Sequence, residues 1–178
     1  MKQIRFYQII TAVCCLLLIS CGIDKNLKKG EKFLALGEYY DAADQFKQAY
    51  TKTPSKERAS RGKIALKMAR CYDKINSTPK AIAAYRNAVR YNQASIDDRL
   101  AYARLLLKNG EYKQAEKEFR ILVDSLPGNV LARNGLKSAQ FAPTWKKEGS
   151  RYKVKKMDVF NSRRDDYSPM LLGDEADQ

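Results

Sequence analysis

The sequence predicts an all-α fold of repeated helix pairs, because a small–large–small pattern recurs at helical spacing along its middle. In residues 37–54, Ala42, Phe46 and Ala49 recur every four and then three positions, which places them on one face of a helix. Pro54 ends this helix, because proline lacks a backbone N–H and clashes with the preceding turn. One helix pair cannot bury such a face alone, so neighbouring copies are expected.

Two further copies carry the same pattern at the same offsets: Ala81, Tyr85 and Ala88, then Ala115, Phe119 and Leu122. The alanines that open the second and third copies are 34 positions apart, and those that open the first and second are 39 apart. The helices that precede these copies carry a matching small and large residue: Gly30 and Phe33, Ala69 and Tyr72, Ala103 and Leu106. These residues are therefore the expected packing positions between helices.

With these motifs the chain resembles the tetratricopeptide-repeat family, whose repeat length is about 34 residues. The resemblance implies an all-α superhelix of three helix pairs plus a capping helix, with a short extended or β C-terminal tail. The implied repeats lie near 23–56, 62–95 and 96–129, within a domain at 21–142, and the cap lies at 129–141. The tryptophan usual near the start of each repeat is absent.

Capping residues mark the expected helix starts. The extra residues 57–61 contain neither glycine nor proline, so the first helix of repeat two is expected to begin near Ser55. Ser95 and Asp98 have the spacing of a capping box, with aspartate in place of the usual glutamate. Asn129 is the expected cap of the final helix, which protects the exposed end of the repeat array.

The first 20 residues have the character of a signal peptide. A short apolar run at 9–19 follows two basic residues and is too short for a comfortable membrane span. It ends in Leu18-Ile19-Ser20-Cys21, which resembles a bacterial lipobox. The resemblance implies that residues 1–20 are removed and that Cys21 is acylated. An ordinary signal peptide or a short anchor helix is the alternative.

The residues after Cys21 indicate where such a lipoprotein would reside. Gly22 stands where an acidic residue would resemble an inner-membrane retention signal, and no acidic run resembling a surface-export signal follows. This favours the periplasmic face of the outer membrane, with a short tether because the first helix starts near Asp24.

Residues 143–178 differ in character from the repeats and are expected to be a linker and a short extended segment. Tyr152–Phe160 alternates roughly as a strand would. The stretch FNSRRDDYSPML looks like the opening of a β-propeller blade. It resembles Bacteroidota lipoproteins that combine tetratricopeptide repeats, a propeller and an OmpA-like domain, some of them in type IX secretion or gliding motility. A disordered C-terminus is the alternative.

Charge and composition argue against an enzyme. The chain has a net charge of +14 and no histidine, the commonest general base and metal ligand. No nucleophile with a base, phosphate-binding glycine loop or cluster of metal ligands is recognisable, so no catalytic residue, metal, cofactor or small-molecule substrate is expected. An exported lipoprotein rarely meets nucleic acid, which disfavours that partner despite the basic charge.

Some of the basic residues share helix faces. Spacings of four, three and four residues align the cations of the first helix of repeat two, and repeat three repeats two of these positions: Lys63, Lys67, Arg70 and Lys74, then Arg104 and Lys108. The family resemblance implies that first helices line the concave groove, so these cations are expected to form a continuous basic stripe there. A solvated helix face is the alternative. The family's carboxylate clamp does not carry over, because Leu27, Glu31 and Asp97 occupy its positions.

These observations predict a non-enzymatic adaptor lipoprotein. It would be held to the membrane through Cys21 and would bind an envelope or secretion-system protein in its groove. Two alternatives remain: a stand-alone repeat lipoprotein that assists outer-membrane protein assembly, and a module that binds lipopolysaccharide or peptidoglycan.

Overall fold

The computed structural model describes residues 23–148, in which the chain forms seven helices and no strand. The first comprises residues 23–35, and the others are α2 (Tyr39–Lys52), α3 (Arg58–Lys74), α4 (Thr78–Arg90), α5 (Ile96–Lys108), α6 (Tyr112–Ser125) and α7 (Val130–Glu148). The predicted all-α class is confirmed. The predictions for residues 1–22, including Cys21, and for an extended segment after residue 148 lie outside the described residues.

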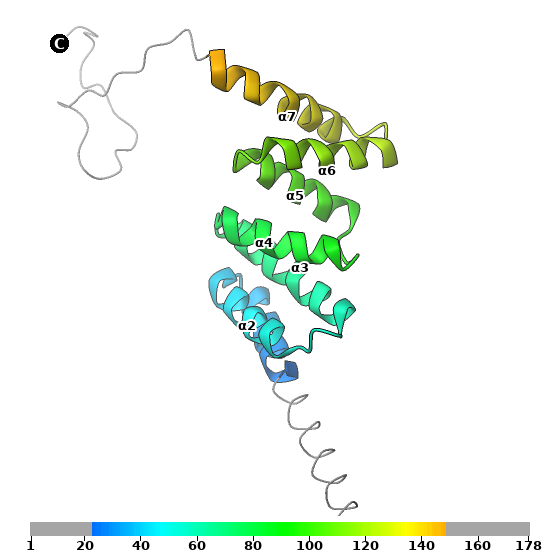
Figure 1. Cartoon of the computed structure of the whole chain (residues 1–178). Coiled ribbons are helices and arrows are strands. Elements are labelled where there is room, and N and C mark those ends of the chain that lie inside the picture. Colours follow the sequence, from blue (N-terminus) through cyan, green and yellow to red (C-terminus); the bar gives the residue numbers. More distant parts are fainter. Residues whose placement is uncertain (1–22, 149–178) are drawn as a thin grey trace, which may run out of the picture.

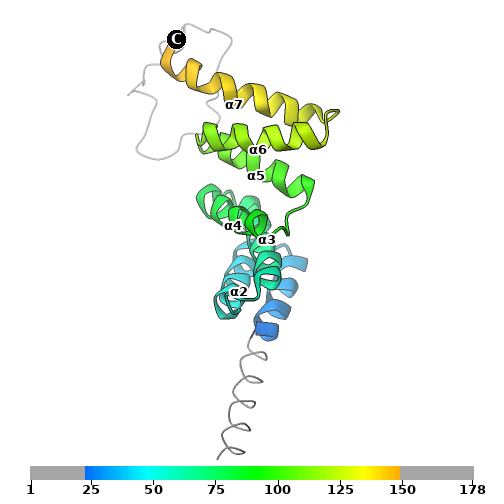
Figure 2. The ribbon, with the colours of Figure 1, turned by 45° about the vertical axis from the view of Figure 1, so that its right-hand side comes forward.

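The helices form antiparallel pairs that stack in one file, so that each helix contacts the next along the chain (Figure 1). The same single-file stack is visible after rotation in Figure 2. α5 also contacts α7, which shows that the first helix of one pair lies beside the first helix of the following unit. The connections α2–α3, α4–α5 and α6–α7 lie along one edge of the stack, on the right-hand side of Figure 1.

The core is made of the repeated small and large residues. The aromatic rings of Phe46 and Phe119 are fully buried, and Tyr85 is nearly so. The alanines on either side of these rings are all fully buried: Ala42, Ala49, Ala69, Ala81, Ala88, Ala103 and Ala115. Phe33 and Tyr72 are partly buried against the same clusters. Small side chains therefore let neighbouring helices approach and close around each ring.

Glycine provides the closest of these approaches. A Cβ added at Gly30 would lie 2.6 Å from Cε1 of Phe46, too close for any real pair of carbon atoms. A Cβ at Gly135 in α7 would meet the ring of Phe119 more closely still. These two positions have room only for hydrogen, because the ring of the neighbouring helix rests on the backbone.

The turns between paired helices repeat with the same register as the core. Gly37, Asn76 and Gly110 each adopt a left-handed backbone conformation, with φ of 77°, 58° and 82°. Glycine accepts this conformation without a steric penalty, and asparagine tolerates it better than most residues. The three repeats therefore reverse direction at equivalent positions.

Two expected caps are present. The Ser95 hydroxyl accepts a hydrogen bond from the Asp98 backbone N–H at 3.2 Å, and the Asp98 carboxylate accepts one from the Ser95 N–H at 3.0 Å. This reciprocal pair is the predicted capping box of α5. The Asn129 side chain likewise accepts from the backbone N–H of Ala132 at 3.0 Å, at the start of α7.

Two boundaries differ from the prediction. α3 starts at Arg58 rather than near Ser55, and its N-cap residue Glu57 makes no side-chain capping hydrogen bond. The final helix does not end at Phe141 but continues to Glu148 with Pro143 inside it. Proline removes one backbone hydrogen bond, yet the rings of Phe141 and Trp145 stack across the same turn, with centroids 6.3 Å apart.

Candidate functional site

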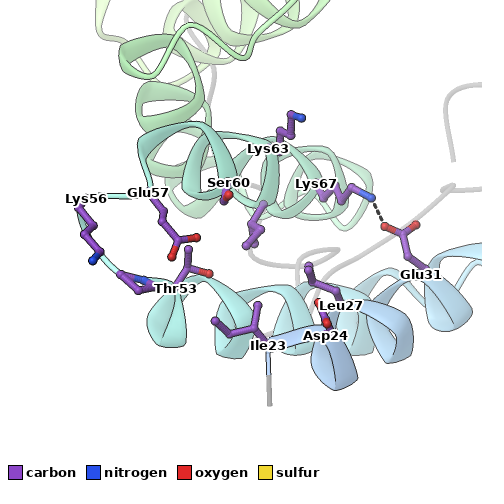
Figure 3. A pocket seen from close by; sticks show the side chains of 12 residues that line it. Ile23, Asp24, Leu27, Glu31, Thr53, Lys56, Glu57, Ser60, Lys63 and Lys67 are labelled. Atoms are coloured by element: carbon purple, nitrogen blue, oxygen red, sulfur yellow. Dashed lines mark hydrogen bonds and ion pairs between the residues drawn. The ribbon is translucent and has the colours of Figure 1, made fainter. Parts of the chain in front are cut away.

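Ion pairs join the first helices of the three repeats side by side. Lys67 of α3 pairs with Glu31 of the helix at 23–35, as the dashed line in Figure 3 shows. Arg70, almost one turn further along α3, pairs with Asp98 of α5. Lys67 and Arg70 therefore link the first helix of repeat two to the first helices of both neighbouring repeats. The predicted cations do not form a stripe of uniformly free charge, because these two are neutralised by acids from the neighbouring repeats.

The Arg70–Asp98 pair is built into the repeat interface. Arg70 donates from Nε to Oδ1 at 2.9 Å and from Nη2 to Oδ2 at 3.0 Å. The Asp98 side chain is 6% exposed, whereas the Arg70 side chain is 57% exposed. Burial raises the pKa of Asp98, but hydrogen bonds from Arg70 and Ser95 lower it by more, so it lies below its ordinary value. Arg70 therefore contributes to the packing of α3 against α5.

The remaining predicted cations are exposed and lie outside the ion pairs described above. Lys63, Lys74, Arg104 and Lys108 are all exposed. None of the four takes part in an ion pair within residues 23–148, although Lys108 donates a hydrogen bond to the side chain of Asn76. Arg104 and Lys108 line a surface cavity of about 280 Å³ together with Asp73. These four cations on α3 and α5 are the predicted groove residues that remain exposed and outside the ion pairs of residues 23–148.

A larger cavity of about 560 Å³ lies where the helix at 23–35 faces α3 and the connection before it (Figure 3). Its apolar lining includes Ile23, Leu27 and Ile64, and its charged rim includes Lys63 and Lys67. The cavity joins residues about 40 positions apart in the chain, so helical periodicity alone could not reveal it.

The buried thiol is not a candidate nucleophile. Cys71 is fully buried on α3, and burial raises the pKa of its thiol to about 11. The thiolate is the reactive form, so this cysteine is a packing residue. Between residues 23 and 148, no cluster of three or more potential ligand residues could hold a metal ion. In the same range, no helix is both long and apolar enough to cross a membrane.

Comparison with known proteins identifies the fold. No protein-family model matches the chain. The curated relatives include DnaJ homolog subfamily C member 3 of Gallus gallus, 30% identical over 154 residues, which cover 86% of this chain and 28% of that protein. The Rattus norvegicus protein of that name is 29% identical over 149 residues, covering 81% and 27%. The chain thus spans between a quarter and a third of the length of these relatives.

Solved structures of tetratricopeptide-repeat (TPR) domains align over most of the chain. The Sgt2 TPR domain from Aspergillus fumigatus has a TM-score of 0.53 at 17% identity, covering 79% of this chain and 91% of that one. The second TPR domain of human RPAP3, in complex with the HSP70 peptide SGPTIEEVD, has a TM-score of 0.53 at 16% identity, covering 68% and 98%. The first TPR of Spaghetti (RPAP3), bound to the HSP90 peptide SRMEEVD, has a TM-score of 0.53 at 18% identity, covering 70% and 95%. Residues 23–148 therefore adopt a tetratricopeptide-repeat fold, with three helix pairs and a capping helix.

Proposed function

We propose that this chain is a non-enzymatic adaptor that binds an acidic segment of a protein partner through α3 and α5. The observation that carries this proposal is a set of exposed cations on those two helices that have no acidic partner among residues 23–148: Lys63, Lys74, Arg104 and Lys108. They lie on the two helices that the Arg70–Asp98 pair joins, so one extended segment could contact several of them.

Charge complementarity supports an acidic partner. The peptides bound by the two RPAP3 domains each contain two consecutive glutamates and a terminal aspartate. An acidic segment of that kind could form ion pairs with the exposed cations of α3 and α5. Since Leu27, Glu31 and Asp97 stand at the positions of the family's carboxylate clamp, recognition would depend on side-chain carboxylates of the partner rather than on its chain terminus.

We further propose that the adaptor is anchored by acylated Cys21 to the periplasmic face of a bacterial outer membrane. The lipobox-like residues before Cys21 support the anchor, and the absence of an acidic residue at Gly22 supports the outer membrane. The resemblance of residues 160–171 to the start of a propeller blade supports a Bacteroidota envelope assembly of the type IX secretion or gliding class. Mass spectrometry of the native protein tests the anchor, because an unmodified Cys21 would refute it.

The groove is tested by reversing three free cations, Lys63→Glu, Lys74→Glu and Arg104→Glu, in one variant. These substitutions leave the Arg70–Asp98 pair intact, so the fold should persist in circular dichroism. A matched control reverses three exposed lysines on α6 and α7: Lys113→Glu, Lys117→Glu and Lys137→Glu. Both variants have the same net charge, so a difference between them reports on position.

The readout is fluorescence anisotropy of the labelled peptide SGPTIEEVD and of its analogue SGPTIQQVN, which lacks the acidic side chains but keeps the terminal carboxylate. Three exposed charge pairs contribute together about 1.4 kcal/mol, so the groove variant should bind the acidic peptide about tenfold more weakly than the control variant does. Equal binding by both variants would refute the proposal. Cross-linking in solubilised envelopes gives a second test: a partner that both variants capture equally, or envelope glycan bound without any protein, would also contradict it.

A further inference from the structure

A second basic surface lies at the edge of the stack, outside the groove. Ser55, Lys56, Arg58, Arg90 and Tyr91 line an open cavity of about 530 Å³ where the α2–α3 connection meets the end of α4. We call Lys56, Arg58 and Arg90 the basic edge cluster. Its members lie up to 34 positions apart in the chain and meet only because α3 and α4 pack together.

Within the part of the chain that the structure describes, no carboxylate lines this cavity. The nearest acid in the chain, Glu57, lines the larger cavity of Figure 3 instead, where it lies beside Thr53. Among the ion pairs of residues 23–148, none includes a member of the basic edge cluster. Among the described residues, the Arg90 guanidinium donates to two uncharged groups, the side-chain oxygen of Asn87 at 2.8 Å and the hydroxyl of Tyr91 at 3.2 Å.

The start of α3 adds to this positive charge. A helix N-terminus carries a partial positive charge and exposes unpaired backbone N–H groups. In this chain α5 compensates this charge with Asp97 and Asp98, whereas α4 and α6 have neither a side-chain cap nor an acid in the first turn. The first turn of α3 contains no acid, Glu57 does not cap it, and Lys56 and Arg58 stand beside it. This arrangement is unfavourable for the helix alone and favourable once an anion is bound.

The pKa of the Tyr91 hydroxyl is lowered by the same positive charge. Desolvation raises the pKa of its hydroxyl, but the guanidinium groups of Arg90 and Arg61 lower it by more, so the pKa lies below the ordinary tyrosine value. Arg61 itself is held in place by hydrogen bonds from Nη1 to the backbone oxygens of Tyr50 and Thr53, at 3.3 and 2.7 Å. The hydroxyls of Ser55 and Tyr91 complete a cavity that offers donors and cations to an anion.

The position of this cavity identifies the source of the anion. Lys56 lines both this cavity and the larger one, and Ile23 lines the larger one as well. Lys56 therefore joins the basic edge cluster to the cavity where the described chain begins. Cys21 is two residues before Ile23, and two residues span at most about 7 Å. An acyl chain on Cys21 would place a membrane surface within reach of the cluster.

We propose that Lys56, Arg58 and Arg90 bind the phosphate groups of anionic phospholipids in the membrane that holds the chain. This inference relies on the proposed lipid anchor for its geometry, but it concerns different residues from the partner groove. Binding at this edge orients the stack on the membrane and leaves Lys74, Arg104 and Lys108, which line neither cavity, free for a protein. The two basic surfaces of the chain thus bind two kinds of partner, a membrane at the basic edge cluster and a protein in the groove.

The test is co-sedimentation of the full chain with phosphatidylcholine vesicles, with and without phosphatidylglycerol. The variant carries Lys56→Gln, Arg58→Gln and Arg90→Gln, and the matched control carries Lys113→Gln, Lys117→Gln and Lys137→Gln. All variants keep the same N-terminal segment, so its own affinity for vesicles cancels in the comparison. Each cation near an anionic surface contributes about fivefold in binding, so the cluster variant should lose on the order of 100-fold of its preference for phosphatidylglycerol.

The loss of preference for phosphatidylglycerol in the control variant should be less than about one fifth of the loss in the cluster variant, because the control lysines lie on α6 and α7, outside the cluster. An equal loss in both variants would mean unspecific attraction by net charge and would overturn the proposal, as would no loss in either. Tight binding of inorganic phosphate by the wild type, lost in the cluster variant without a change in vesicle binding, would assign the site to a soluble phosphate and also overturn it. A chain that prefers phosphatidylglycerol normally but lacks acylation at Cys21 would refute the anchor and not the cluster.

Discussion

Asp98 is predicted to be a single residue whose loss weakens both a helix start and a repeat interface. Its carboxylate accepts from the Ser95 backbone N–H and hydroxyl, at 3.0 and 2.6 Å, and from the two guanidinium nitrogens of Arg70. Asp98→Ala removes all four hydrogen bonds. We expect this substitution to lower the free energy of unfolding far more than the substitution of an exposed aspartate normally does.

The magnitude follows from the two roles. Loss of the reciprocal capping interaction costs about 1 kcal/mol. A hydrogen-bonded ion pair contributes about 1.5–3 kcal/mol, and the low end applies because the Arg70 side chain is more than half exposed. Together these contributions predict a loss of about 2–3 kcal/mol, or about 8–12 °C in melting temperature for a domain of this size.

Urea unfolding followed by circular dichroism measures the change, with Asp97→Ala as the matched control. Asp97 occupies the same first turn but is exposed, so its charge should contribute only about 0.3–1 kcal/mol through the helix dipole. A double-mutant cycle with Arg70→Gln should give a coupling of about 1 kcal/mol. If Asp98→Ala costs no more than Asp97→Ala at neutral pH, the reasoning from these contacts is wrong.

Acid should reveal the same interaction. The pKa of Asp98 is lower in the folded chain than its ordinary value of 3.8, so the folded state favours the charged carboxylate. Its contribution to stability is therefore complete above that ordinary value and is lost as the pH falls through the folded-state pKa. The difference in stability between the wild type and Asp98→Asn should shrink on acidification below pH 3.8. A difference that grows in acid would contradict the assigned direction of the shift.

Three further predictions concern the core. Phe46→Ala should cost about 3–5 kcal/mol in urea unfolding, whereas Lys47→Ala on the exposed side of the same helix should stay within about 0.5 kcal/mol; equal values would show that the core face is misassigned. Gly135→Ala should destabilise by about 1–3 kcal/mol, because the added Cβ meets the Phe119 ring, and a melting curve unchanged from wild type would refute that contact. Cys71 should react with a thiol reagent only as fast as the chain opens, since burial raises the pKa of its thiol to about 11; fast labelling of the folded chain would contradict this.

Much of the fold could be predicted from local patterns. The repeat of alanine, ring and small residue identified the helix pairs, because residues three and four apart share a helix face regardless of what packs on it. The capping box at Ser95 and Asp98 was equally local, since both partners lie within one helical turn. Local rules failed at Pro143, where the helix continues past a residue that normally ends one.

The sequence by itself determined the period, the register of the buried rings and the excess of basic side chains, because each depends on neighbours a few residues away. Only the tertiary structure decided which cations are free. Arg70 and Lys67 are neutralised by acids 28 and 36 positions distant, while Lys56, Arg58 and Arg90 gather at a cavity that no carboxylate of residues 23–148 lines. The physical reason is that electrostatic partners are set by distance in space, and those distances follow from how closely the small residues let successive helix pairs stack.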